Sequence, residues 1–284
     1  MYSFINNEIV PVSGATIQVS DLALHRGYGI FDFFKISDGH VYFLDDYLDR
    51  FWNSANLMRL PVPLERKQIV QAIDSLIEKN NVKDSGIKLI LTGGYSPDGY
   101  QIANPNLIMT HHSLVLPAPE VVDKGVRIVT HDYVREFANA KTINYTMGIW
   151  LIEKIRQANA VDVLYQKDGL VSEFPRCNFF IVRKDNTVVT PRHNVLHGIT
   201  RKNVLRLAAE HYRVEEGDVS LSDVFDAKEA FLTSTTKRIV PIVEVDDRII
   251  GTGKPGEVSL TLLDKLIALE RADQKENASL KKNY

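Results

Sequence analysis

The sequence has little cysteine, no long apolar run and no excess of positive charge. The single cysteine, Cys177, has no partner in the chain, so disulfide bonds cannot stabilise the fold. No segment reaches the ~18 consecutive apolar residues that a membrane-spanning helix needs. The N-terminus lacks the basic and then apolar run of a secretory signal. We therefore expect a cytoplasmic protein that has no membrane partner.

Charge and composition exclude a further class of partner. The 34 Lys and Arg residues nearly balance the 36 Asp and Glu residues, which leaves a formal net charge of −2. A chain without a basic surplus is not expected to bind nucleic acid. With 44% hydrophobic and 25% charged residues, the composition is that of an ordinary globular protein. Composition therefore leaves an enzyme and a binding module both open.

Metal ligands are also scarce in the sequence. His111 and His112 are neighbours within an expected strand, so their rings point to opposite faces and cannot both bind one ion. The chain has no pair of cysteines and no His-Glu-x-x-His motif. We therefore expect no metal site.

The hydrophobic patterns of the first half predict a mixed α/β (α+β) fold. Apolar residues recur every three or four positions over 44–58 and again over 69–77, which predicts two amphipathic helices. Runs at 87–92 and 106–116 are rich in Ile, Leu and Val, which predicts buried strands. Helices and strands are thus interspersed in this half of the chain.

A pair of prolines marks the expected division of the chain. Pro117 and Pro119 cannot continue a central strand, because proline has no N–H to donate to a neighbouring strand. At ~100–200 residues per domain, the chain has room for two. We expect an N-terminal α/β domain, 1–118, and a C-terminal domain, 119–284. In the latter, the patterns predict strands at 126–130, 230–233 and 239–245, hairpins at 167–169 and 184–186, and helices at about 144–158 and after Gly198.

Three separated segments offer groups that bind phosphate. Gly198 opens an expected amphipathic helix, where free backbone N–H groups and the helix dipole favour an anion. Four hydroxyl residues, 233–236, follow an apolar strand, and Arg50 lies near the apolar face of its helix, where a guanidinium can bind phosphate. Each feature alone also fits an ordinary helix start, a polar strand end or a surface arginine.

Two further residues fit covalent chemistry on a nitrogen heterocycle. Lys141 precedes a helix rich in Ile, Met and Trp, where desolvation can leave its amine uncharged and able to form a Schiff base. Glu173 follows a strand-like segment and can hold a pyridine nitrogen protonated. Each alone is equally well a surface or ion-pair residue. Together with the three phosphate-binding segments, they fit pyridoxal phosphate, a ligand that has a phosphate, a pyridine ring and an aldehyde.

The order and spacing of these residues resemble the class IV (fold type IV) pyridoxal-phosphate aminotransferases, the family of the branched-chain and D-amino-acid enzymes. The resemblance covers most of the chain. It implies a two-domain, D-amino-acid-aminotransferase-like fold, a C-terminal domain that binds the cofactor, and a homodimer. The blocks that carry it are Asp21–Asp32, Leu48–Phe51, Val171–Glu173, Gly198–Arg201 and Leu232–Thr236.

The resemblance also implies roles for single residues. Lys141 carries the cofactor as a Schiff base and acts as a general base, and Glu173 pairs with the pyridine nitrogen. Tyr145 corresponds to a tyrosine that hydrogen-bonds the cofactor's phenolic oxygen, although helix packing explains this residue as well. The phosphate is bound by Arg50, the backbone N–H groups of Ile199 and Thr200, and Thr235, with Ser234 close by.

The residues expected to bind the substrate's carboxylate depart from the family's better-known patterns. The D-alanine enzymes have an Arg-x-His pair after a Ser-Pro turn, whereas this chain has an acid, Asp98, and a phenol there. Because Asp98 would repel a carboxylate, Arg26 and Lys88 remain as candidates. The alternatives are an ion pair of Arg26 with Asp32 and a partly exposed strand at Lys88. Phe31 supplies apolar surface for an aliphatic substrate, or belongs to the core.

These residues lead to one expected activity and two alternatives. We expect a transaminase that uses pyridoxal phosphate to exchange the amino group of a small or branched-chain amino acid, L or D, with a 2-oxo acid. Aminodeoxychorismate lyase is the alternative on the same fold, because the same Lys141 and Glu173 serve its chemistry. A non-catalytic binding module is the alternative from another class. The intact Lys141, Glu173 and phosphate-binding residues argue against it.

Overall fold

The computed structural model describes residues 1–281, which fall into two compact units. Among the described residues, the first unit comprises 1–114, 140–144 and 272–281, and the second comprises 115–139 and 145–271. The chain thus leaves the second unit at 140–144 to contribute to the first. The domain boundary that we predict at residue 118 stays a prediction, because packing alone does not report independent folding.

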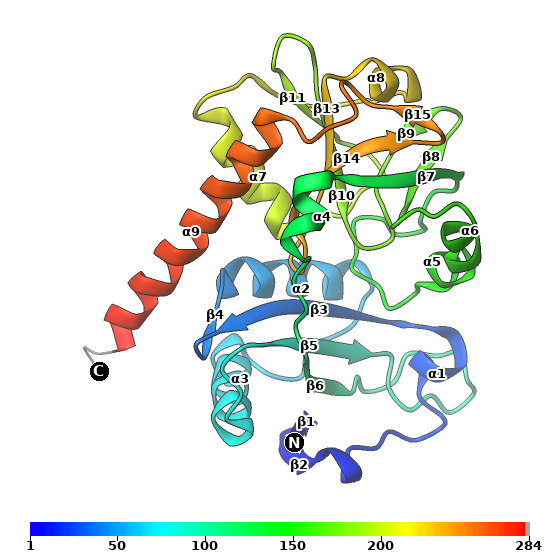
Figure 1. The fold of residues 1–284 in the computed structure, drawn as a ribbon. Helices are drawn as coiled ribbons and strands as arrows, with labels where there is room; N and C mark the ends of the chain where they lie inside the picture. The colour runs from blue at the N-terminus through cyan, green and yellow to red at the C-terminus, as the bar shows by residue number, and fades with distance from the viewer. Residues whose placement is uncertain (282–284) are drawn as a thin grey trace. The chain divides into compact units, whose positions relative to one another are not determined.

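The first unit combines a sheet with helices (Figure 1). Its elements are β1 (Tyr2–Ile5), β2 (Glu8–Pro11), a 3-10 turn η1 (Val12–Gly14), α1 (Leu22–Arg26), β3 (Gly29–Ser37), β4 (His40–Val41), α2 (Leu44–Leu57), α3 (Arg66–Asn80), β5 (Ser85–Thr92) and β6 (Leu107–His112).

The strands of the first unit form a six-stranded antiparallel sheet in the order β2-β1-β6-β5-β3-β4. Helix α2 packs on β3, and α3 packs on β1. Both helices occupy the segments that the apolar periodicity predicts. Ile69 and Ile73 of α3 and Leu48 and Phe51 of α2 are fully buried. Burial of one apolar face per helix stabilises this layer.

Strand β3 presents different residues on its two faces, because side chains alternate along a strand. Phe31 pairs with Ile90 of β5, and Phe33 pairs with Lys88, so these four side chains share one face. The opposite face of β3 carries Asp32, which is fully buried. The two faces of β3 therefore serve different parts of the candidate site.

The second unit also combines a sheet with helices (Figure 1). Its elements are α4 (Pro119–Lys124), β7 (Val126–Asp132), α5 (Thr146–Trp150), α6 (Ile152–Gln157), β8 (Val163–Lys167), β9 (Leu170–Val171), β10 (Asn178–Val182), β11 (Val188–Pro191), α7 (Ile199–Ala209), β12 (Val214–Gly217), α8 (Leu221–Asp226), β13 (Glu229–Ser234), β14 (Arg238–Val245), β15 (Arg248–Ile249) and α9 (Glu257–Lys281), whose last residues group with the first unit.

The strands of the second unit form a nine-stranded mixed sheet in the order β12-β11-β10-β13-β14-β7-β8-β9, and β15 pairs with β14. Phe180 and Phe231 stack on one face and pack with Val204 of α7 and Leu262 of α9. The neighbouring Phe179 belongs to a second apolar cluster on the other face. Both faces of the central strands are therefore buried, which agrees with their near-continuous apolar sequence.

Two elements differ from the sequence-based expectation. The helix predicted over about 144–158 is broken at Leu151 into α5 and α6, and Leu151 itself is fully buried. The strand predicted over 106–116 ends at His112, because its partner β5 begins at Ser85 and the last pair is Gly86 with His112. The mixed α/β prediction is confirmed. None of the helices within residues 1–281 is long and apolar enough to cross a membrane.

Candidate active site

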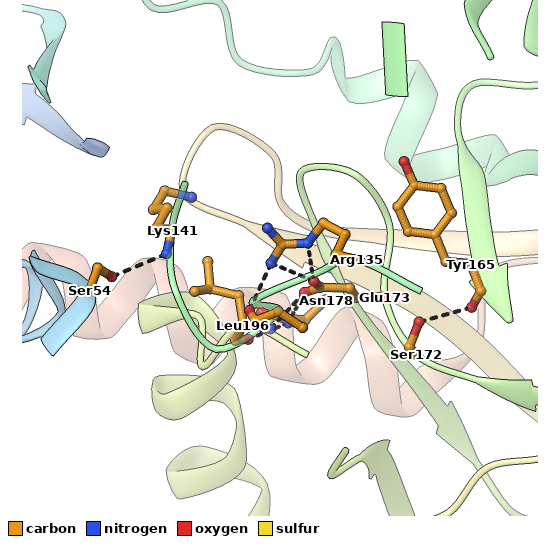
Figure 2. Close-up of polar contacts among 9 residues, drawn as sticks. Ser54, Arg135, Lys141, Tyr165, Ser172, Glu173, Asn178 and Leu196 are labelled. Atoms are coloured by element: carbon orange, nitrogen blue, oxygen red, sulfur yellow. Dashed lines mark hydrogen bonds and ion pairs between the residues drawn. The ribbon is translucent and has the colours of Figure 1, made fainter. Parts of the chain in front are cut away.

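The segment that carries Lys141 is held by the first residues of β3. The Phe31 N–H donates to the Lys141 carbonyl at 2.9 Å, and the Ile143 N–H donates to the Gly29 carbonyl at 3.0 Å. On the other side, the Lys141 N–H donates to the Ser54 hydroxyl of α2 at 3.1 Å (Figure 2). These bonds involve only the main chain of Lys141, so they position its side chain without engaging the amine.

Two lysine side chains lie against the ring of Phe31. The Lys141 Nζ is 4.8 Å from the ring centroid, and the Lys88 Nζ is 5.5 Å from the same centroid. Lys88 is half-buried, and burial lowers the pKa of its amine below the ordinary value. No carboxylate in the described part of the chain pairs with Lys88. Phe31 is thus a half-buried apolar surface beside a reactive-lysine candidate and a second cation that can bind an anion.

The opposite face of β3 holds Arg50 through Asp32. The Arg50 Nε donates to Asp32 Oδ2 at 2.9 Å, and its Nη2 donates to Asp32 Oδ1 at 2.6 Å. Both side chains are buried, with relative exposures of 9% and 0%. The two parallel bonds fix the plane of the guanidinium. The surface-arginine alternative for Arg50 is therefore wrong, and so is the ion pair of Asp32 with Arg26.

In the second unit, Glu173 is the centre of a buried polar network (Figure 2). Its Oε1 accepts from the Arg135 Nε at 2.8 Å, and its Oε2 accepts from the Leu196 N–H at 2.8 Å. Asn178 lies beside it, and the Asn178 Nδ2 donates to the Leu196 carbonyl at 2.7 Å. With 3% of its surface exposed, Glu173 is not the surface residue that the sequence alone leaves open.

The charge of Glu173 is balanced by Arg135. Burial lowers the pKa of Arg135, but the Glu173 carboxylate and the nearby Tyr145 raise it by more, so the net shift is upward. The guanidinium therefore stays charged within this network. Arg135 also donates from Nη2 to the Ala138 carbonyl at 2.8 Å, which ties Glu173 to the loop that leads to Lys141.

The N-terminus of α7 has the form of an anion site. Gly198 precedes the helix, and no side chain among the described residues caps the first-turn N–H groups of Ile199 and Thr200. A Cβ at Gly198 would lie 2.1 Å from the Asn178 Oδ1, so a larger residue here would displace the Asn178 side chain or the start of the helix. Thr233, the strand partner of Asn178, has a buried hydroxyl without a hydrogen-bond partner in the described residues.

The hydroxyl turn after β13 lies near the single cysteine. The Lys237 N–H donates to the Ser234 hydroxyl at 3.1 Å, and the nearby Ser234 side chain lowers the pKa of the Cys177 thiol by less than burial raises it. Burial raises the pKa of Cys177 to about 11, so the thiol is neutral. Ser234 thus shapes the turn, while Thr235, the next residue, is half-buried.

The remaining predicted residues occupy different surroundings. Tyr145 immediately precedes α5 and is half-buried. Arg26 lies at the end of α1, where it is exposed and donates to the His25 carbonyl. Asp98 accepts hydrogen bonds from the backbone N–H groups of Gln101 and Tyr100, and these bonds lower its pKa. No group of three or more His, Cys, Asp or Glu side chains within residues 1–274, where side chains are described, could hold a metal ion.

Several residues of these networks escape prediction from the sequence, namely Asp32, Ser54, Arg135 and Asn178. Arg135 and Glu173 are 38 positions apart, and Arg50 and Asp32 are 18 apart. No local pattern marks such pairs. Asn178 does leave a signal, because it is a polar residue at the start of a strand whose residues are all buried.

Comparisons with known proteins agree on one family. Residues 29–245 match the family described as Amino-transferase class IV. The chain is 28% identical to a branched-chain-amino-acid aminotransferase of Pseudomonas aeruginosa, over 89% of this chain and 88% of that protein. It is 26% identical to a D-alanine aminotransferase of Bacillus licheniformis, over 91% and 93%.

A solved structure supports the same assignment. The branched-chain amino acid aminotransferase of T.th. with pyridoxamine 5'-phosphate matches with a TM-score of 0.88 at 25% identity, covering 95% of this chain and 94% of that one. This likeness confirms the expected fold, and the family match confirms the expected enzyme class. The relatives named here are aminotransferases, which does not favour the lyase alternative. The chain belongs to the class IV aminotransferases, a family of enzymes that depend on pyridoxal phosphate.

Proposed function

We propose that this enzyme exchanges the amino group of a small or branched-chain amino acid with a 2-oxo acid, and that Lys141 is its catalytic residue. The observation that carries the proposal is the placement of the Lys141 and Lys88 amines against the Phe31 ring. An apolar ring beside a reactive amine and a second cation suits a substrate that has an aliphatic side chain and a carboxylate. The substrates named for the similar enzymes, branched-chain amino acids and D-alanine, support the same range.

The residues present fit pyridoxal phosphate. The uncapped first turn of α7 offers N–H groups of Ile199 and Thr200 to a phosphate, and glycine at position 198 lets the turn lie close to Asn178. Arg50, oriented by Asp32, and Thr235 are the further phosphate ligands that we propose. The resemblance assigns Tyr145 to the phenolic oxygen and places Ser234 among the cofactor-binding residues, close to the phosphate.

When bound, pyridoxal phosphate supplies an electrophilic aldehyde carbon and a ring that accepts electron density from the substrate's Cα. Lys141 would hold that carbon through its Nζ. The Lys141 amine, when free, would carry a proton between the substrate's Cα and the cofactor's aldehyde carbon. Glu173, held by Arg135 and Leu196, would accept a hydrogen bond from the ring nitrogen and so keep that nitrogen protonated.

A half-reaction screen tests the substrate range. The pyridoxal form of the enzyme is mixed with D-alanine, L-leucine, L-glutamate and aminodeoxychorismate in turn, and the loss of cofactor absorption is followed. We expect amino acids to convert the cofactor to its amine form. Response to L-leucine and L-glutamate alone excludes the D-amino-acid substrates. Release of pyruvate from aminodeoxychorismate without response to any amino acid would show the lyase instead.

Lys88→Met tests whether Lys88 binds the substrate's carboxylate. We expect KM for the amino acid to rise about tenfold or more, because a charge-assisted hydrogen bond is lost. Burial lowers the pKa of Lys88 in the folded chain, so its charge costs stability at every pH below the unfolded pKa, and Met should raise Tm. The exposed Lys83→Met is the matched control. An unchanged KM would show that Lys88 does not bind the substrate.

Gly198→Ala tests the anion site at α7. The added Cβ meets the Asn178 Oδ1, so the first turn or the Asn178 side chain must shift, and the bond from Asn178 to the Leu196 carbonyl opposes a shift of the side chain. We expect affinity for pyridoxal phosphate to fall about tenfold or more, because the N–H groups of the turn move away from the phosphate. Fluorescence titration of the apoenzyme measures it. Gly14→Ala is the control, since its Cβ would have no neighbour within 4 Å. Equal affinity in both variants would place the phosphate elsewhere.

We also propose a homodimer and a cytoplasmic location. Four large apolar side chains of the second unit support self-association, because they are 58% to 69% exposed. Light scattering should give twice the chain mass, and Trp150→Ser should weaken the dimer. A fully active monomer would contradict the homodimer. The four side chains are Phe137, Ile149, Trp150 and Ile152.

The single cysteine supports the cytoplasmic location, because disulfide bonds are rare in a reducing compartment.

A further inference from the structure

Arg135 and Glu173 form a buried ion pair (Figure 2). The side chains are 11% and 4% exposed. Both the Nε and the Nη2 of Arg135 lie 2.8 Å from the same oxygen, Oε1 of Glu173. The guanidinium therefore contacts one edge of the carboxylate and leaves the other edge to different partners.

The second edge of the Glu173 carboxylate has neutral donors. The Leu196 N–H donates to Oε2 at 2.8 Å, and the Asn178 Nδ2 lies 3.5 Å from the same oxygen. Asn178 is itself fixed by its bond to the Leu196 carbonyl. Both oxygens of the carboxylate are thus held, Oε1 by a cation and Oε2 by neutral N–H groups.

A carboxylate buried to this degree is ionised only when its charge is balanced. Without a partner, desolvation favours the protonated acid, which cannot hold a proton on a ring nitrogen. The Leu196 N–H and the Asn178 amide donate hydrogen bonds but carry no charge. The positive charge beside Glu173 comes from Arg135, which is not among the residues that the sequence assigned to the site.

We propose that Arg135 is a positioning residue that keeps Glu173 ionised and fixes its carboxylate plane toward the ring nitrogen of the cofactor. The inference rests on the proposed function of Glu173. Arg135 acts through Glu173, whose Oε1 it contacts. The competing role is structural, because the Nη2 bond to the Ala138 carbonyl also holds the loop before Lys141.

A cofactor analogue separates the two roles. The 1-deaza analogue of pyridoxal phosphate has carbon in place of the ring nitrogen, so it cannot use Glu173. Affinities of the apoenzyme for both compounds are measured for the wild type, Arg135→Gln and Arg135→Lys. The exposed Arg176→Gln, on the turn between Glu173 and Asn178, is the charge-matched control.

We expect Arg135→Gln to lower the affinity for pyridoxal phosphate about tenfold and to change the affinity for the deaza analogue by less than about twofold. Arg135→Lys should retain most of the preference, and Arg176→Gln all of it. An equal loss for both compounds shows that Arg135 only holds the loop, and no loss for either shows that Glu173 does not need it. Either result overturns the inference.

A measurement on the wild-type apoenzyme does not depend on any variant folding. The carboxyl carbon of Glu173, labelled with ¹³C and assigned by its absence in Glu173→Gln, should have the chemical shift of a carboxylate at pH 7. A protonated shift overturns the inference. Failure of the proposed function looks different, because the wild type would then bind neither compound and borohydride would leave no adduct on Lys141.

Discussion

Replacing Lys141 with alanine is expected to lower transaminase activity by about 10⁴-fold, the upper range for a general acid–base group. The amine is lost both as the covalent anchor and as the proton carrier. The fold should persist, because the bonds to Phe31 and Ser54 use only the main chain of residue 141. We therefore expect the free energy of unfolding to change by less than about 1 kcal/mol.

Borohydride reduction and mass spectrometry measure this effect directly. Wild-type protein should gain one reduced cofactor on the peptide that contains Lys141, and Lys141→Ala should gain none. The exposed Lys124→Ala is the control and should react like the wild type. A full adduct in the alanine variant would move the catalytic role to another lysine, and Lys88 would be the first to test because it lies against the same ring.

Strand β3 explains why one block of the family resemblance is continuous. The main chain of Gly29 and Phe31 pairs with the segment that carries Lys141, and the Phe31 ring lies under the amine. The next residue, Asp32, points to the opposite face and orients Arg50. The strand thus holds the Lys141 segment through its main chain, presents Phe31 on one face and presents Asp32 on the other. A shift of one residue in register would exchange the two faces and separate Phe31 from Lys141 and Asp32 from Arg50.

The sequence predicts those features that depend on local patterns. The helices α2, α3 and α7 follow apolar periodicity, and the start of α7 follows Gly198. The break at Leu151 and the end of β6 depend on tertiary packing and on strand register, which local patterns do not report.

The same distinction applies to the site. Lys141, Glu173 and Arg50 are identified by their order in the chain, and the structure supplies what surrounds them. Neither the partner of Arg50 nor that of Glu173 could be predicted, since each ion pair joins distant segments. An isolated acid or base carries no mark of its partner, so Asp32 and Arg135 emerge only when the strands and loops are in place.

Glu173→Gln is expected to lower activity by about 10²-fold or more, because the ring nitrogen loses the charge that holds its proton. It should also destabilise the protein, although glutamine has nearly the same shape. Glu173 accepts on both oxygens, from Arg135 and from the Leu196 N–H. Glutamine has one oxygen, so its NH₂ must face either Arg135 or the Leu196 N–H, which are both donors. In addition, Arg135 loses the negative charge of Glu173 while it remains buried. Breaking a buried pair in this way costs about 3 kcal/mol.

The double variant Glu173→Gln with Arg135→Met separates stability from catalysis. Methionine removes the opposing donor and the unbalanced charge, so chemical denaturation should return much of the lost free energy of unfolding. Half-reaction rates should stay as low as in Glu173→Gln, because no anion faces the ring nitrogen in either protein. Recovery of both properties would mean that Glu173 serves the fold alone. Recovery of stability alone would assign the Glu173 carboxylate to the cofactor. Arg135 would then be present because a charge that faces the cofactor must be balanced where it is buried.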